Sequence, residues 1–192
     1  MLYFENLQGS CKVLLKIEKV HSVLYYIRDY NHKLMDYEEA SKLLIMCSSF
    51  DRFQTFLKIK DELNDKDYWR ILAYVYTCSD NLYYLKEEVK EAFLEDRSER
   101  EYLMNKNELK VYNSLPENII IYRGMTSMEL ECRDFGVSWT LSKERAEFFA
   151  FKYGRNYATE NKPKVVHQLE VKKVEILAYF NERNEQEVIY IQ

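Results

Sequence analysis

The chain has 192 residues, of which 47% are hydrophobic, so it can bury the core of one domain that carries an appendage. Its net charge of −4 lacks the basic excess that is typical of proteins that follow a nucleic-acid backbone. No apolar run approaches the ~18 residues that suggest a membrane span, so we expect no membrane partner.

Composition divides the chain near residue 114. Residues 1–10 contain the letters of an engineered protease-cleavage tag in altered order, so we interpret them as a tag remnant and leave them out of the fold prediction. The stretch from Cys11 to Asn113 holds no glycine or proline, which favours helices. We expect a helical region over 11–114 and a strand-rich catalytic core over 115–192, joined in one compact domain.

Apolar residues at three- and four-residue steps predict the helices of the first region. The predicted helices cover residues 13–27, 37–45, 50–63, 67–76, 83–94 and 101–112. Asp36 and Asp67 stand where N-caps of the second and fourth helices are expected.

Short β-branched segments follow Pro116 and predict strands. The predicted strands cover residues 118–123, 136–140, 165–171, 174–178 and 187–191. One helix is expected among them, from Lys143 to about Tyr153, with Ser142 as its N-cap and Gly154 as its stop. The predicted fold class is therefore α+β, with the helical region first.

Arg123 and Gly124 end the first predicted strand. A guanidinium offers a planar, permanently charged fork to a phosphate or a carboxylate. The glycine lets the backbone approach a ligand closely. Taken alone, this pair is more typical of a surface ion pair at a strand end.

Ser138 and Thr140 lie two residues apart on the second predicted strand. Their hydroxyls should share one face of the sheet, and Trp139 should point the other way. Two hydroxyls near an arginine suggest a polar cleft, although a Ser/Thr-rich edge strand has the same pattern.

Glu185 and Glu187 stand at the start of the last predicted strand. Residues i and i+2 of a strand face the same way, so we expect the two carboxylates to be neighbours. Neighbouring carboxylates repel each other, which predicts a raised pKa for one of them. Such a pair suits one electrostatic and one acid/base role, although a charged junction before a strand is common.

Taken in order, these motifs resemble the R-S-E class of mono-ADP-ribosyltransferases, which includes cholera-type toxins and the vertebrate arginine-specific enzymes. The resemblance covers residues 115–192, including Leu115-Pro116 before Tyr-Arg-Gly and the helix after the Ser-x-Thr strand. It implies a split β-sandwich core, NAD as a substrate and no metal.

The resemblance also implies roles for single residues. Arg123 would hold the NAD phosphates, and the backbone of Gly124 would contact the nicotinamide carboxamide. Ser138 would position Glu187 and the nicotinamide ribose, and Thr140 would support that strand and the cofactor site. Glu187 would bind the ribose 2′-hydroxyl and stabilise the oxocarbenium-like transition state.

The remaining roles concern the acceptor and the nicotinamide. Glu185 would orient or deprotonate the nucleophile, and a glutamate at this position goes with arginine acceptors in this class. Residues 179–184 would form the substrate-recognition loop. Phe149 is a candidate for stacking on nicotinamide, although its place in a predicted helix favours core packing. The interval between Arg123 and Ser138 is short, so any helix there must be trimmed.

The implied reaction transfers ADP-ribose from NAD to a protein side chain, with arginine as the favoured acceptor, and releases nicotinamide. Two alternatives use the same site: modification of a nucleobase in RNA or DNA, and simple hydrolysis of NAD. A local basic patch for nucleic acid could comprise Lys143, Arg145, Lys162, Lys164, Lys172 and Lys173. A non-enzymatic alternative is a degenerate domain that binds a protein partner through its helices.

Bacterial and phage toxins and effectors commonly use this fold. The resemblance therefore points to a protein substrate, and to an antitoxin or immunity protein as a further partner. The expected location is the cytoplasm, or a target cell after secretion or delivery.

Overall fold

The computed structural model describes residues 34–80, 82–153 and 162–192. The predicted helix over 13–27 and the expected stop at Gly154 lie outside these residues. By its internal contacts the chain divides into two units, Met1–Met35 and Asp36–Gln192. The second unit holds every described helix and all five strands, on both sides of residue 114.

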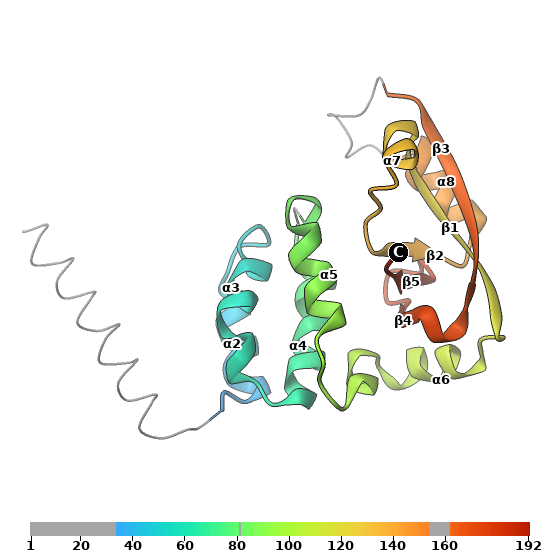
Figure 1. Ribbon diagram of the computed structural model, residues 1–192. Helices are drawn as coiled ribbons and strands as arrows, with labels where there is room; N and C mark the ends of the chain where they lie inside the picture. The colour runs from blue at the N-terminus through green and yellow to red at the C-terminus, as the bar shows by residue number, and fades with distance from the viewer. Residues whose placement is uncertain (1–33, 81, 154–161) are drawn as a thin grey trace, which may run out of the picture. The chain divides into compact units, whose positions relative to one another are not determined.

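Each helix predicted from residue 37 to residue 114 is present (Figure 1). The first has the predicted bounds, and the others have shifted ends. The helices are α2 (Tyr37–Ile45), α3 (Arg52–Ile59), α4 (Asp65–Cys78), α5 (Lys86–Leu94) and α6 (Lys106–Ser114). Three short 3-10 turns overlap residues that were predicted as helix ends. They are η1 (Lys60–Glu62) after α3, η2 (Leu82–Leu85) before α5 and η3 (Arg100–Leu103) before α6.

The two predicted N-caps had different outcomes. Asp36 caps α2, because its side chain accepts a hydrogen bond from the backbone of Glu39 at 2.9 Å. The prediction for Asp67 was wrong. Asn64 caps α4 two residues earlier than expected, and its side chain accepts from the backbone of Asp67 at 2.9 Å. Asp67 lies in the first turn of α4 instead, where its carboxylate pairs with Arg70.

Aromatic side chains fill the core between α3, α4 and α5. Tyr68 and Trp69 of α4 are fully buried and meet edge to face at 4.9 Å between ring centroids. The hydroxyl of Tyr68 donates to the carbonyl of Ala92 at 2.8 Å, so this buried polar group is satisfied. The helical region therefore has a packed core of its own.

The five described strands form one antiparallel sheet in the order β3-β1-β2-β5-β4. They are β1 (Asn118–Thr126), β2 (Ser138–Thr140), β3 (Lys164–Lys172), β4 (Ile176–Phe180) and β5 (Glu187–Tyr190), and the 3-10 turn η5 (Lys173–Glu175) joins β3 to β4. β1 and β3 pair along nine residues, whereas β1 and β2 pair only at Tyr122 and Thr140. This single-pair join divides the sheet into a β3–β1 half and a β2–β5–β4 half.

Two helices accompany the strands. α7 (Ser127–Cys132) is the short helix that fits the interval between Arg123 and Ser138. α8 (Lys143–Phe151) follows β2 and is capped by Ser142 as predicted, since the Ser142 hydroxyl accepts from the backbone of Arg145. Figure 1 shows α8 alongside β1 and β3.

Gly124 of β1 permits the close approach of α8. A β-carbon at this position would lie 2.2 Å from the carbonyl oxygen of Ala146 and 2.7 Å from the backbone nitrogen of Ala150. Neither backbone atom can move away without shifting the helix. We expected this glycine to bring the backbone close to a ligand. The structure shows that it brings β1 close to a helix.

The helical region and the sheet share buried contacts at β4 and β5. The ring of Tyr76 in α4 lies 5.8 Å from that of Phe180 in β4 and 5.0 Å from that of Phe93 in α5. On α6, the Glu108 carboxylate accepts from the backbone of Asn181 at 2.8 Å. These contacts explain why the helices and the strands fall in one unit.

The α+β class is confirmed for the described residues. None of the described helices combines the length and the hydropathy that crossing a membrane requires.

Candidate active site

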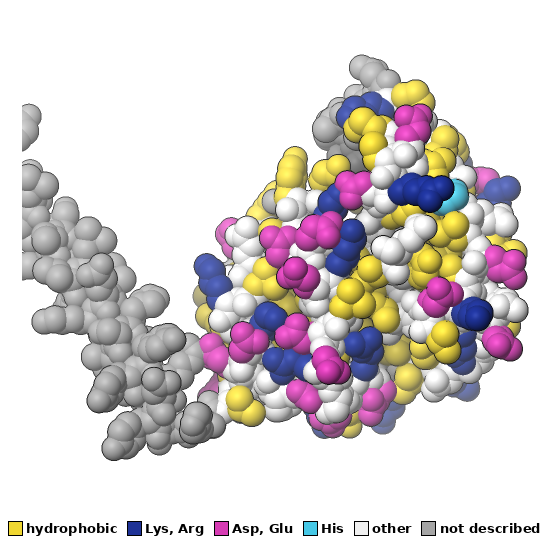
Figure 2. Space-filling view, viewed as in Figure 1, with side chains coloured by type: hydrophobic (Ala, Val, Ile, Leu, Met, Phe, Trp, Pro, Cys, Tyr) yellow, Lys and Arg dark blue, Asp and Glu magenta, His cyan; other side chains and the backbone are white. Residues whose placement is uncertain are grey.

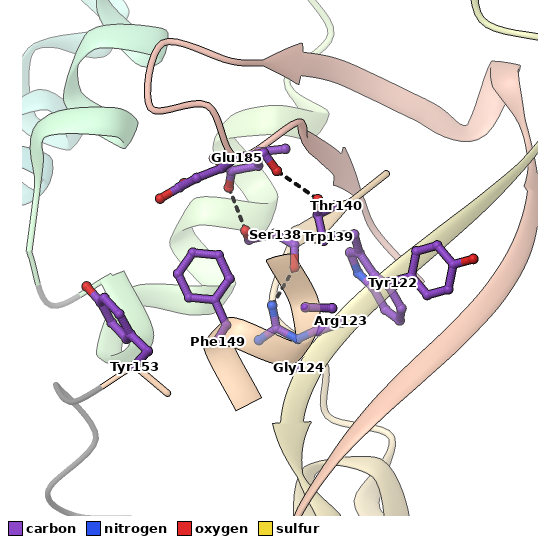
Figure 3. Close-up of a pocket in the computed structure, with 11 residues that line it drawn as sticks. Tyr122, Arg123, Gly124, Ser138, Trp139, Thr140, Phe149, Tyr153 and Glu185 are labelled. Atoms are coloured by element: carbon purple, nitrogen blue, oxygen red, sulfur yellow. Dashed lines mark hydrogen bonds between the residues drawn. The ribbon is translucent and has the colours of Figure 1, made fainter. Parts of the chain in front are cut away.

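One cleft brings together all seven residues that the sequence proposed for the site (Figure 3). It lies between β1, β2, α8 and the segment that enters β5. Its lining comprises Tyr122, Arg123, Gly124, Ser138, Trp139, Thr140, Ala146, Phe149, Tyr153, Glu185 and Glu187. The cavity has a volume of about 220 Å³, which is below the ~300–1,000 Å³ usual for ligand sites.

Glu187 is buried at the base of this cleft, with 4% of its surface exposed. Its Oε1 atom accepts hydrogen bonds from the Ser138 hydroxyl at 2.5 Å and from the Tyr76 hydroxyl at 2.7 Å. Its Oε2 atom accepts from Nη2 of Arg183 at 3.0 Å. A buried carboxylate requires such partners, since an isolated buried charge is very costly. The expected contact between Ser138 and Glu187 is therefore present.

Tyr76 joins the site from the helical region, and the sequence analysis missed it. Burial raises the pKa of its hydroxyl well above the ordinary 10.0, and the neighbouring Glu187 carboxylate raises it further. The hydroxyl therefore remains protonated and donates to Glu187 at neutral pH. No local signal could have found Tyr76, because 111 positions separate the two residues and the α4 pattern alone explains a buried aromatic.

Arg123 is held by acceptors on two elements. Its Nε and Nη2 atoms lie 2.9 and 2.8 Å from Oε1 of Glu129 in α7, and its Nη1 donates to the backbone carbonyl of Ser138 at 2.5 Å. Gly136 leaves room for this arrangement, because a β-carbon there would lie 2.9 Å from Nη2 of Arg123. Arg123 thus fixes the strand whose hydroxyl binds Glu187.

These contacts change the role expected for Arg123. A guanidinium has five N–H donors, and three are used by Glu129 and Ser138. Two remain for a ligand, and Glu129 balances the positive charge. Glu129 was not among the residues predicted from the sequence. The pattern Thr126-x-x-Glu129 was the available signal, because the Thr126 hydroxyl accepts from the backbone of Glu129 and caps α7.

Glu185 and Glu187 are neighbours, as predicted, and share one cation. Nη2 of Arg183 lies 3.0 Å from Oε2 of each carboxylate. The pKa of Glu185 is raised, chiefly by burial; Arg183 opposes this shift and Glu187 adds to it. The predicted direction is therefore found, but burial is a larger cause than repulsion between the carboxylates.

Strand alternation was predicted to place Glu185 beside Glu187, and this reason was wrong. β5 begins only at Glu187, and Gln186 has a left-handed φ of 47°, so strand alternation does not relate the two glutamates. A tight turn brings them together instead. The Asn181 side chain accepts from the backbone of Gln186 at 3.0 Å and closes this turn.

Thr140 and Trp139 support the site from within the protein. The Thr140 hydroxyl donates to the carbonyl of Glu185 at 2.7 Å and accepts from the backbone of Ser142 at 3.0 Å, so it anchors the turn. The buried Trp139 ring lies among the rings of Phe135, His167 and Tyr190, and Trp139 also lines the cleft.

Phe149 lines the cleft, although its helical position favoured core packing. It is half-buried, and its ring lies 5.3 Å from that of Tyr153, which also lines the cleft. Figure 3 shows the Phe149 ring turned from α8 toward the residues of the cleft, with Tyr153 beside it. The two rings give the cleft an aromatic wall.

In comparisons with known proteins, no family model, curated protein or solved structure matches this chain.

Proposed function

We propose that this protein transfers ADP-ribose from NAD to a protein side chain, with arginine as the favoured acceptor, and releases nicotinamide. The observation that carries the proposal is the buried Glu187 carboxylate, which Ser138 and Tyr76 hold at the base of a cleft that also contains Arg123. A fixed negative charge in a partly dehydrated site is suited to a reaction that develops positive charge.

The proposed reaction breaks the bond between C1′ of the ribose and the nicotinamide nitrogen. The electron pair of that bond goes to the nicotinamide ring, and positive charge develops on the ribose. Glu187 stabilises this charge, because its Oε1 atom is held by Ser138 and Tyr76. A guanidine nitrogen of the acceptor then bonds to C1′ and gives its proton to Glu185, whose raised pKa makes it a stronger base.

The other residues of the cleft match the parts of NAD. The two remaining N–H donors of Arg123 suit a phosphate oxygen or a ribose hydroxyl. Phe149 and Tyr153 offer ring faces and edges to a nicotinamide ring. These assignments come from the resemblance and from the chemistry of the side chains.

The finer part of the fold prediction is a split β-sandwich, and the weak join within the sheet supports it. A split β-sandwich has two sheets, whereas the described strands form one. This sheet is joined between β1 and β2 by a single residue pair, Tyr122 with Thr140, and the cleft contains both residues. We therefore interpret the β3–β1 and β2–β5–β4 halves as the counterparts of the two sheets.

The basic residues favour a protein acceptor over a nucleic acid. Lys164 and Lys172 lie at opposite ends of the nine-residue strand β3, about 26 Å apart at strand geometry. Lys143 lies near Glu147, and the side chain of Lys173 donates to the carbonyl of Asn113. Figure 2 shows acidic and basic side chains intermixed on the viewed face. The six candidates therefore do not form one continuous basic surface.

Labelled NAD tests the proposal in a lysate. We expect the protein to label a protein band that protease removes and nuclease does not. Glu187→Gln should abolish the label. Glu170→Gln should retain it, because Glu170 is an exposed residue of β3 that does not line the cleft. Label that survives in Glu187→Gln would contradict the proposal. Nuclease-sensitive label would indicate a nucleobase acceptor, and release of nicotinamide without label would indicate hydrolysis.

A further inference from the structure

Beside the cleft, a guanidinium of this chain contacts the two glutamates that line it. Nη2 of Arg183 lies 3.0 Å from Oε2 of Glu185 and 3.0 Å from Oε2 of Glu187. An arginine acceptor would need this placement, next to the proposed base and the proposed catalytic carboxylate. Arg183 is also accessible, since half of its side-chain surface is exposed.

The backbone on both sides of Arg183 forms a turn that holds this residue beside Glu185 and Glu187. Asn184 and Gln186 have left-handed φ values of 55° and 47°, a backbone conformation that is unfavourable for most residues other than glycine. Both ends of the turn are anchored, by Asn181 bound to Glu108 and by the Gln186 carbonyl bound to the backbone of Leu141 at 3.0 Å. The contact with the carboxylates is therefore supported by a defined turn.

We propose that Arg183 is the protein's own acceptor and becomes ADP-ribosylated within the same chain. This inference rests on the proposed function. An Nη atom of Arg183 forms the new bond to C1′ of the ribose as the bond to nicotinamide breaks. The leaving electron pair goes to the nicotinamide ring, and the proton of the attacking nitrogen goes to Glu185.

The position of Arg183 has two consequences for the reaction. An external arginine must displace Arg183 from Glu185 and Glu187 before it can react, so the two acceptors compete. Each chain has one such guanidinium in contact with both carboxylates among the described residues, so one ADP-ribose per chain is expected at this position.

The test uses the purified full chain with NAD, intact-mass measurement and peptide mapping. We expect a mass increase of one ADP-ribose, located on Arg183. Arg183→Lys keeps a positive charge without the guanidine and should lose this label, and Arg183→Gln should do the same. Arg133→Lys should keep the label, because Arg133 is exposed at the end of α7 and touches neither glutamate. Added agmatine, a small guanidine, should reduce the label on Arg183.

Two further readouts separate the possible failures. Nicotinamide release without a label on Arg183 would overturn this inference and leave the proposed function intact. Absence of nicotinamide release would overturn both. Reaction within one chain predicts a labelled fraction that is independent of protein concentration. Label that appears on Glu187→Gln chains mixed with the wild type would instead show transfer between chains and would contradict the proposal.

Discussion

The helical region (residues 36–114) and the strand-rich region (residues 118–192) contribute differently to the same carboxylate. Ser138 of β2 and Tyr76 of α4 both donate to Oε1 of Glu187, at 2.5 and 2.7 Å. Ser138 belongs to a motif with a recognisable spacing, whereas Tyr76 comes from a helix with no motif. A helical region that holds none of the motif residues can therefore still supply a hydrogen-bond donor to the central carboxylate of the site.

The largest effect is expected from a glycine, which the two regions use differently. The helical region has no glycine, whereas Gly124 lets β1 approach α8 in the strand-rich region. Gly124→Ala would place a β-carbon 2.2 Å from a backbone oxygen of α8. We expect it to lower the free energy of unfolding by about 3 kcal/mol, measured by urea denaturation. Gly136→Ala is the comparison and should cost less stability, since its β-carbon would meet side-chain atoms of Arg123 and no backbone atom. An unchanged stability of Gly124→Ala would contradict the packing account.

The second prediction compares the two donors to Glu187. Ser138→Ala and Tyr76→Phe each remove one hydrogen bond to a charged group, worth about 2 kcal/mol. Each should slow nicotinamide release by about 30-fold. The double variant should slow nicotinamide release by less than the product of the two single factors, because both hydroxyls bind one oxygen.

Tyr68→Phe is the matched control for Tyr76→Phe. Both tyrosines are buried in α4, but the hydroxyl of Tyr68 donates to Ala92 away from the cleft. Tyr68→Phe should lose about 1 kcal/mol of stability and Tyr76→Phe about 2 kcal/mol, and only Tyr76→Phe should lose activity. Equal losses of activity would show that Tyr76 acts through stability alone.

The two regions should also respond to opposite ends of the pH range. Burial raises the pKa of Glu185 above the ordinary 4.5, so transfer to an acceptor should fall as the pH drops through this raised pKa. Burial also raises the pKa of Tyr76 above 10.0. In the unfolded chain Tyr76 ionises near pH 10 and in the folded chain it does not, so the stability that it contributes is present below pH 10 and declines above it. Transfer rates at low pH test the prediction for Glu185. Urea midpoints at high pH test the prediction for Tyr76.

The smallest effects concern helix caps, one in each region. Asn105 accepts from the backbone of Asn107 and Glu108 at the start of α6, and Ser142 accepts from Arg145 at the start of α8. Asn105→Ala and Ser142→Ala should each cost about 1 kcal/mol in urea denaturation. A larger effect on activity is expected for Ser142→Ala, because α8 carries Phe149 of the cleft, whereas no residue of α6 lines the cleft.

The helices and strands were largely predictable, because periodic apolar residues and the positions of glycine and proline mark them locally. The errors arose at element ends, where a neighbouring side chain decides the boundary: Asn64 caps α4 in place of Asp67. The residues that gather in the cleft were predictable from their motifs. Glu129 had a local signal in the Thr126-x-x-Glu129 pattern. Tyr76 and the contacts of Arg183 had none, because they depend on distant packing and on a tight turn that strand alternation does not describe.

The most direct test of the account is nicotinamide release by the purified protein in the presence of NAD. The central claim is that Glu187, held by a strand hydroxyl and a helix hydroxyl, stabilises the ribose as nicotinamide leaves. We predict that the wild type releases nicotinamide and that Glu187→Gln, which keeps the size of the side chain and removes its charge, is slower by about 100-fold or more. Equal rates for the two proteins, or no release by either, would contradict the claim.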